Sequence, residues 1–411
     1  LCKETAVAAL PLCAAAQGLA WGEAKRRGDA GAAAAALAGE KMATYVAATL
    51  VLLVARLSWQ GGPPFLHPEA NPGAFAGRRV TRWLTLHYYF YRHLALLVWP
   101  HPLCCDWSHS SIPLVTDVHD PRSCRALLAI YGPAGAAVGS AAVAVSRWAC
   151  RERRFPKERI LALVVDCRPQ LLAILLIFLP LLPSSNLVFP VGFAVAERVL
   201  YLPSLGICAL AGMASARALQ AAAAAAARRP AGWRPGFGQI LAVCALLAPV
   251  GWGMRQCREQ SLAWRSAEAL YRHAVAVNPG NEKLHDLLAT RLHNSGGDAD
   301  VVERHAMQAI TINPGFWHAH ATLGQLYSSR GNASGAARRF KEALRLAEEQ
   351  NLDDMADAPK VRLNLAMLLQ GTSSAEAETH FRRAVGGGGL GDLQATAQVI
   401  LGAFLESSPK A

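Results

Sequence analysis

The sequence carries little charge for its length, and the features that it lacks exclude several classes of protein. Only 17% of its 411 residues are charged whereas 53% are hydrophobic, which is too apolar for an ordinary soluble protein. None of its ten cysteines forms a C-x-x-C pair, so the usual zinc and redox motifs are missing. The net charge is +12, but no basic face interleaved with aromatic residues occurs, and nucleic-acid binding is not predicted.

Two further absences concern metals and targeting. The adjacent Cys104 and Cys105, with His101 and His109 nearby, form the only local Cys/His cluster. Adjacent cysteines cannot easily bind one ion together, so no metal site is predicted. The sequence shows no signal peptide and begins at Leu1 inside an apolar run. We therefore expect that its natural N-terminus lies upstream.

Long apolar runs occupy the first half of the sequence and predict membrane-spanning helices. A bilayer core is crossed by about 20 apolar residues in helix. The six candidate spans are Thr5 to Ala20, Met42 to Leu57, Cys124 to Ala149, Ile160 to Leu182, Val191 to Ala214 and Phe237 to Met254. Pro169 is expected to kink or restart the fourth of them.

A seventh apolar stretch, Trp83 to Pro100, is rich in Trp and Tyr and contains His87, Arg92 and His93. These residues are typical of the membrane interface, so we expect a helix that lies along the surface. All three basic loops then fall on one side of the membrane, as the positive-inside rule requires; they are Lys25 to Arg27, Arg151 to Arg159 and Arg228 to Arg229. Residues 60–123 and the chain after Met254 fall on the opposite face.

The adjacent Glu197 and Arg198 stand about midway along the apolar stretch from Phe189 to Gly206. Ionisable groups in a bilayer cost several kcal/mol and usually face a partner, a cavity or a substrate. The pair is therefore a candidate functional site. The alternative is a structural pair that holds neighbouring helices together.

A second candidate lies in the long loop, where Asp106, Trp107 and Ser108 are consecutive. They offer a carboxylate, a stacking surface and a hydroxyl, which together suit a sugar or a phosphate. A solvated turn with a tryptophan anchored in the headgroups would use the same residues.

After Met254 the sequence becomes charged and amphipathic, and it repeats. Ala274, Ala309, Ala343 and Ala384 recur at spacings of 34 to 41 residues, which is close to the tetratricopeptide period. The first helix of each pair carries small residues, most clearly in Leu323-Gly324 with Tyr327. The pattern predicts an α-solenoid with a groove for an extended protein partner.

These patterns predict an all-α chain with two kinds of domain. Residues 1–58 and 124–255 would hold membrane spans and residues 59–123 a lumenal loop with an interfacial helix. Residues 256–390 would form the repeats and 391–411 a tail. Asn332 begins an N-x-S triplet on a repeat turn, which is a glycosylation acceptor and fits a lumenal location.

Four motifs precede the repeats: LCKETAV at Leu1, NPGAF at Asn71, CCDWSHSSIPLV at Cys104 and SSNLVFPVGFAVAERVLYLPSLGIC at Ser184. On these motifs and the repeats, the sequence resembles the transmembrane and tetratricopeptide-repeat-containing (TMTC) O-mannosyltransferases of the endoplasmic reticulum. The resemblance covers nearly the whole chain. It implies an inverting, GT-C-type membrane enzyme. Such an enzyme transfers mannose from dolichyl phosphate mannose, its donor substrate, to Ser or Thr of cadherin-like proteins, and needs no cofactor.

The resemblance also suggests roles for particular residues. An inverting transfer needs a base for the acceptor hydroxyl and cationic groups for the departing phosphate. Arg198, with Lys3 second and Glu4 beside it, is the candidate for the phosphate. Glu197 would orient Arg198, and Tyr201 would join Asp106 and Trp107 in lining the pocket.

The family's catalytic acidic residue lies in a first lumenal loop, and no residue here matches it. We therefore expect the general base upstream of Leu1, the membrane domain to be truncated at its N-terminus, and the isolated chain to be inactive. The competing hypothesis is a non-enzymatic membrane adaptor whose repeats recruit partners and whose Glu197-Arg198 pair is structural. A transporter is disfavoured because the sequence lacks inverted repeats.

Overall fold

The computed structural model describes residues 9–26, 32–59, 67–132, 166–227, 237–350, 357–386 and 394–407. Within these ranges all regular secondary structure is helical and no strand occurs, which confirms the predicted all-α class. The chain divides into two compact units. One comprises Leu1–Ser108 and Ile112–Gln260, and the other comprises His109–Ser111 and Ser261–Ala411.

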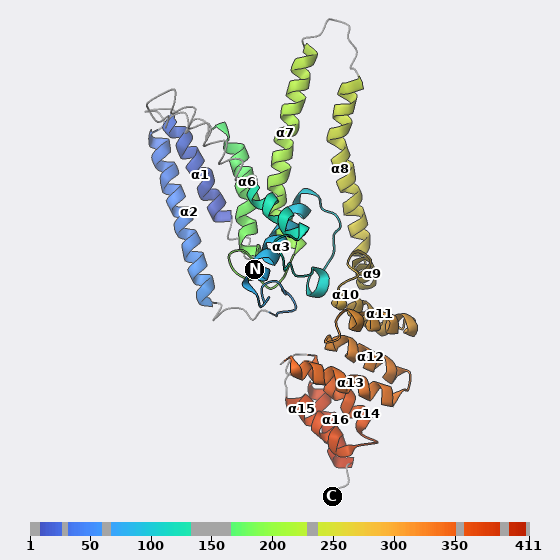
Figure 1. Ribbon diagram of the computed structural model, residues 1–411. Helices are drawn as coiled ribbons and strands as arrows, with labels where there is room; N and C mark the ends of the chain where they lie inside the picture. The colour runs from blue at the N-terminus through green and yellow to red at the C-terminus, as the bar shows by residue number, and fades with distance from the viewer. Residues whose placement is uncertain are drawn as a thin grey trace. The chain divides into compact units, whose positions relative to one another are not determined.

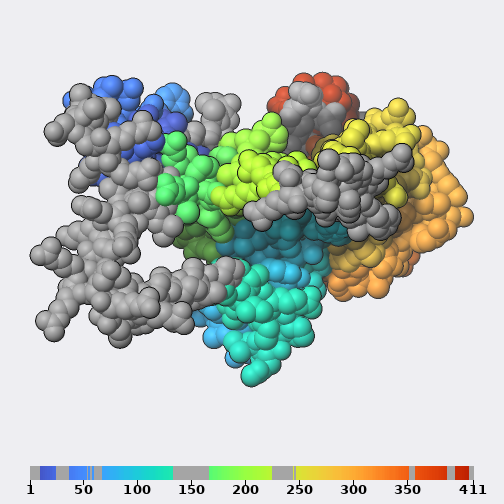
Figure 2. Space-filling model, turned by 90° about the horizontal axis from the view of Figure 1, so that it is seen from above, coloured from blue at the N-terminus to red at the C-terminus, as the bar shows by residue number. Residues whose placement is uncertain are grey.

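Among the residues that the structure describes, six α-helices belong mainly to the first unit (Figure 1). They are α1 (Ala9–Arg26), α2 (Ala32–Trp59), α3 (Arg79–Val98), α6 (Arg168–Leu181), α7 (Tyr201–Ala227) and α8 (Phe237–Ala263). Helix α1 packs against α2 and α6, α6 packs against α7, and α3 contacts α7. Figure 2 shows α6 and α7 against the segment that contains α3.

The predicted restart at Pro169 is confirmed, because α6 begins at Arg168 with the proline in its first turn. A proline is tolerated there, since the first backbone N–H groups of a helix have no partner within it. Most of the expected span from Cys124 to Ala149 lies outside the described residues.

In the described part of the chain, one helical segment, Glu197–Ala224, is long and apolar enough to cross a membrane by length and composition. It joins the short 3₁₀ helix η5 (Glu197–Leu200) to α7. The close approach of α6 and α7 depends on Gly206, because a Cβ at this position would lie 2.4 Å from the carbonyl oxygen of Ala173.

The prediction that Glu197 and Arg198 lie midway along a helix is wrong. Residues 187–196 precede the helix as an irregular loop, so the pair occupies its first turn. Pro190 and Gly192 disfavour helix in this stretch, and polar side chains described below hold the loop in place. A helix start is a less costly position for charge than a bilayer centre.

The second unit is a succession of packed helices (Figure 1). These are α9 (Ala267–Val277), α10 (Glu282–Asn294), α11 (Ala299–Ile312), α12 (Trp317–Ser329), α13 (Ala333–Glu349), α14 (Ala358–Leu369), α15 (Ser374–Gly386) and α16 (Gln394–Ser407). Each packs against its neighbours in the chain. Part of the predicted tail, residues 391–411, is therefore the packed helix α16. The centre of its Phe404 ring lies 5.3 Å from the centre of the Phe381 ring.

The repeated alanines have equivalent environments. Ala274, Ala309, Ala343 and Ala384 lie on α9, α11, α13 and α15, and each is 0% exposed. On the partner helix, a Cβ at Gly324 would come within 2.5 Å of the Phe340 ring. Small residues thus set the distance between paired helices, as the sequence pattern predicts.

Candidate functional site

Two buried asparagines join the motifs at Asn71 and Ser184, which are far apart in the sequence. The Nδ2 of Asn71 donates to Oδ1 of Asn186 (2.7 Å) and to the carbonyl oxygen of Val191 (2.8 Å). Asn186 in turn accepts from the Val191 N–H (2.9 Å) and donates to the Phe193 carbonyl (3.0 Å). Both asparagines are almost completely buried. This network gives the loop before Glu197 a defined shape, because its polar groups find partners inside the protein.

A histidine on α3 holds the end of the same loop. The Nδ1 of His93 is 2.9 Å from the carbonyl oxygen of Tyr89, and its Nε2 is 3.2 Å from the backbone N–H of Ala196. A carbonyl can only accept, so His93 carries its proton on Nδ1 and accepts at Nε2. The neutral ring therefore fixes the backbone immediately before Glu197.

Glu197 contacts the long loop and does not orient Arg198, so that prediction is wrong. Its Oε1 accepts from the backbone N–H of Cys104 (2.6 Å) and from Nε1 of Trp107 (2.9 Å). A carboxylate that accepts two hydrogen bonds on one oxygen is held firmly. Glu197 thus fixes the Trp107 indole, which is 7% exposed.

A cation that sequence reasoning did not select lies against this tryptophan. The guanidinium carbon of Arg92, on α3, is 4.8 Å from the centre of the Trp107 ring, within the range of a cation–π interaction. The buried Nε of Arg92 has no hydrogen-bond partner among the described residues. Arg92, Trp107 and Glu197 thus form a stack, which we call the Arg92 stack. The Nε of its guanidinium is still able to donate a hydrogen bond.

The other predicted donor-site residues are placed differently. Arg198 is exposed, and its guanidinium carbon lies 5.7 Å from the Phe193 ring. Tyr201 is 78% exposed on α7. Lys3 and Glu4 lie outside the described residues. The structure therefore brings Glu197 to Trp107 and leaves Arg198 and Tyr201 on the surface.

Asp106 and Ser108 shape the loop around Trp107. The carboxylate of Asp106 accepts the backbone N–H of Ser108 at 2.7 Å, which is a local turn. This contact agrees with the turn that is the alternative interpretation of the sequence. Trp107 is more than an anchor in the headgroups, because it also contacts Glu197 and Arg92.

The residues that follow, His109–Ser111, belong to the second unit and form a strap against α10. Both carboxylate oxygens of Glu282 take part: Ser110 donates through its N–H and its hydroxyl (both 3.2 Å), and Asn313 donates through Nδ2 (2.9 Å). His109 Nδ1 lies 3.5 Å from the same carboxylate.

The end of the strap is held by two asparagine amides. The Nδ2 atoms of Asn278 and Asn281 both donate to the hydroxyl of Ser111 at 2.8 Å. Burial acts to raise the pKa of Glu282, but the hydrogen bonds from His109 and Asn313 outweigh it and lower the pKa to about 2. Glu282 is therefore an ionised, buried anchor for the strap.

Sequence reasoning missed Arg92 as a site residue, and it missed Asn186 and Glu282. The sequence marks Arg92 only as an interfacial residue of Trp83 to Pro100, because one sequence does not show which distant ring a cation faces. A signal for Asn186 existed, since it belongs to the specific block at Ser184. Glu282 has no local signal, because its partners are up to 172 residues away.

Comparison with known proteins adds an independent result. Residues 60–133, which contain α3 and Trp107, match the family described as "Protein O-mannosyl-transferase TMTC, DUF1736". The chain is 28% identical to Protein O-mannosyl-transferase Tmtc3 of Drosophila melanogaster over 74% of this chain and 30% of the relative. It is 33% identical to Protein O-mannosyl-transferase TMTC4 of Mus musculus over 59% and 28%, respectively.

A longer match extends to Protein O-mannosyl-transferase TMTC3 of Mus musculus, with 28% identity over 84% of this chain and 35% of that protein. The chain thus spans about a third of the length of these curated relatives.

Proposed function

Because the chain belongs to the TMTC family of protein O-mannosyl-transferases, we propose that it contributes the donor-binding loop and the partner-binding repeats of such an enzyme. The donor is dolichyl phosphate mannose, and the acceptors are Ser or Thr hydroxyls of cadherin-like proteins. The protein lies in the endoplasmic reticulum membrane with its repeats in the lumen.

The proposed architecture has a multispan GT-C-type membrane domain followed by a tetratricopeptide solenoid. The apolar segment Glu197–Ala224 supports the first part. The equivalent buried alanines of α9, α11, α13 and α15 and the close helix contact at Gly324 support the second.

The Arg92 stack is the observation that carries the proposed activity. A lipid-linked donor presents its phosphate near the membrane surface, and the transfer breaks the bond between the mannose C1 and a phosphate oxygen. Negative charge then grows on that oxygen as the acceptor oxygen attacks C1 from the opposite face. A fixed guanidinium is well suited to stabilise this charge, because its planar donors match phosphate oxygens.

Glu197 serves this chemistry by positioning. Its Oε1 already accepts two hydrogen bonds, so it holds the Trp107 ring on which Arg92 rests. None of the described residues is assigned as the base that takes the proton from the acceptor hydroxyl. Arg198, at the first turn of the apolar helix, remains the second candidate for the phosphate.

The chain spans about a third of the length of its relatives, and the sequence predicts that it is inactive alone. Mannose transfer is therefore measured in microsomes that express the chain within a protein of its relatives' full length, with dolichyl phosphate mannose and a cadherin domain supplied. Arg92→Gln is expected to lower transfer about 100-fold, the usual effect of removing one charge-stabilising donor. The matched control is Arg79→Gln, because Arg79 lies exposed on the same helix and its loss should leave transfer unchanged.

The outcomes separate the competing hypotheses. Unchanged transfer by Arg92→Gln with a strong loss in Arg198→Ala would move the phosphate contact to Arg198. If no form transfers mannose while cadherin still binds the repeats, the adaptor hypothesis replaces the enzyme.

A further inference from the structure

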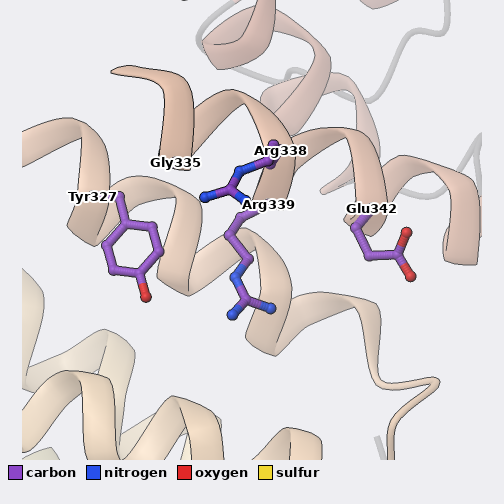
Figure 3. Close-up of a pocket in the computed structure, with 5 residues that line it drawn as sticks. All are labelled: Tyr327, Gly335, Arg338, Arg339 and Glu342. Carbon is purple, nitrogen blue, oxygen red and sulfur yellow. The ribbon is translucent and has the colours of Figure 1, made fainter. Parts of the chain in front are cut away.

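A pocket of about 350 Å³ opens on the second unit between α12 and α13. Figure 3 shows its lining, in which Tyr327 comes from α12 and the other four residues from α13: Gly335, Arg338, Arg339 and Glu342. Gly335 contributes no side chain to the lining. The lining therefore carries two arginines and one glutamate.

Neither arginine has a carboxylate partner among the described residues. Arg338 is exposed and makes no ion pair there. Arg339 is half-buried and contacts Nδ1 of His320 (3.5 Å), the sulfur of Met307 (3.8 Å) and the Tyr327 hydroxyl. Glu342 is near enough for its pKa to be lowered by Arg339, but its hydrogen bonds go to Arg345.

The contact with His320 does not neutralise Arg339. A guanidinium can only donate, so Nδ1 of His320 accepts and is unprotonated. Burial lowers the pKa of His320, and the nearby Arg339 lowers it further, so the ring is neutral at pH 7. Arg339 therefore keeps its full charge beside an uncharged ring.

The acidic groups near the pocket are already paired with other cations. Glu342 accepts from Arg345 through both oxygens, at 2.6 and 2.9 Å. Glu303, on α11, accepts from the Tyr327 hydroxyl (2.7 Å) and from Arg330 (2.9 Å). Arg345 and Arg330 also pair with Glu349 and Asp300, so these two cations are shared between acids. The excess of positive charge lies in the lining itself, which holds two arginines and one glutamate.

From this imbalance we infer that the pocket bounded by Arg338, Arg339 and Tyr327 binds a carboxylate on an extended segment of a protein partner. The planar guanidinium donors match the two oxygens of a carboxylate. Glu342 on the rim opposes a doubly charged phosphate more than a singly charged carboxylate. The Tyr327 hydroxyl already donates to Glu303, so it offers no extra donor for a third phosphate oxygen.

This site goes beyond the proposed mannose transfer, because it concerns the second unit alone and makes no use of the Arg92 stack. Its test is a binding measurement, so a failure here is separate from a failure of the enzymatic proposal.

The experiment measures fluorescence polarisation of a labelled, otherwise neutral nonapeptide with three glutamates, titrated with the whole 411-residue chain in detergent. The matched peptide has glutamine at the three positions. The glutamate peptide should bind at least about tenfold more tightly, since hydrogen bonds to charged groups are the strong ones. Its affinity should fall as salt is raised.

Arg339→Gln should weaken binding about tenfold, and the double variant with Arg338→Gln should weaken it further. Arg382→Gln is the matched control, because Arg382 lies on α15, is 64% exposed and pairs with Glu378; it should bind within about twofold of the parent. Unchanged thermal unfolding of each variant shows that the helices remain folded.

Two results would overturn the inference. The first is equal affinity of the double variant and the parent protein for the glutamate peptide. The second is a phosphoserine version of the peptide that binds more than tenfold more tightly than the glutamate version, which would make the pocket a phosphate site.

Discussion

At the scale of single residues, Asn71 shows how one amide shapes the candidate site. Its Nδ2 donates twice and its Oδ1 accepts the Ala74 N–H at 3.2 Å, so all but one of its hydrogen-bonding positions are used. Two residues later, the backbone of Gly73 packs closely against the Tyr89 ring, since a Cβ at Gly73 would be 2.7 Å from that ring. The amide therefore joins the loop before α3 to the loop before Glu197.

We expect Asn71→Ala to lower the apparent melting temperature in detergent by about 5 to 10 °C, because it leaves buried polar groups of the loop without partners. Asn71→Asp should lower it at least as much, since a carboxylate cannot donate to Asn186 or Val191. Arg78→Ala is the control, because Arg78 is exposed and makes no side-chain cap. Equal melting of all three variants would show that the asparagine network is not stabilising.

At the scale of elements, the strap and α10 are joined by one ionised carboxylate. The pKa of Glu282 in the folded state is lowered to about 2 from an ordinary value of 4.5. The folded protein therefore binds the proton less readily than the unfolded chain. Ionised Glu282 stabilises the fold fully above about pH 4.5, and this contribution is lost as the pH falls towards 2.

Glu282→Gln removes the charge and is expected to lower the free energy of unfolding by about 3 kcal/mol at pH 7. The difference between the parent and the variant should shrink as the pH falls from 4.5 to 2. Denaturant unfolding across this pH range measures it. The control is Glu268→Gln, at an exposed ion pair with Arg272, which should change the free energy of unfolding little at any pH. If the loss of stability in Glu282→Gln were the same at every pH, the charge of Glu282 would not be what stabilises the fold.

At the scale of the whole molecule, the proposed lumenal location of the repeats can be tested at Asn332. Its side chain accepts the Gly335 N–H at 2.9 Å and caps α13, and the residue is exposed. Its Oδ1 makes this bond, so the Nδ2 that would carry a glycan is not needed for the cap.

In microsomes, we expect the chain to carry one endoglycosidase-sensitive glycan, which Asn332→Gln removes. The repeats should also resist protease added from the cytoplasmic side until the membrane is opened by detergent. Gel mobility and immunoblotting of the C-terminal fragments measure both. Cleavage of the repeats in sealed microsomes would contradict the proposed orientation.

Sequence by itself determined the helical class and the positions of the repeated alanines. Both depend on local properties, namely composition and a helical period that recurs along the chain. Even the start of α6 at Arg168, with Pro169 in its first turn, follows from the geometry of one residue. The membrane topology and the glycan at Asn332 remain predictions from the same local signals.

Only the tertiary structure decided the partners of the charged groups. Glu197 stands next to Arg198 in sequence yet binds Trp107, which lies 90 residues away, and the cation on that ring is Arg92. The physical reason is that the shape of the loop before Glu197 is set by distant contacts, chiefly those of Asn71, Asn186 and His93. Adjacency along the chain carries no information about such contacts, because they form only when the helices and loops pack.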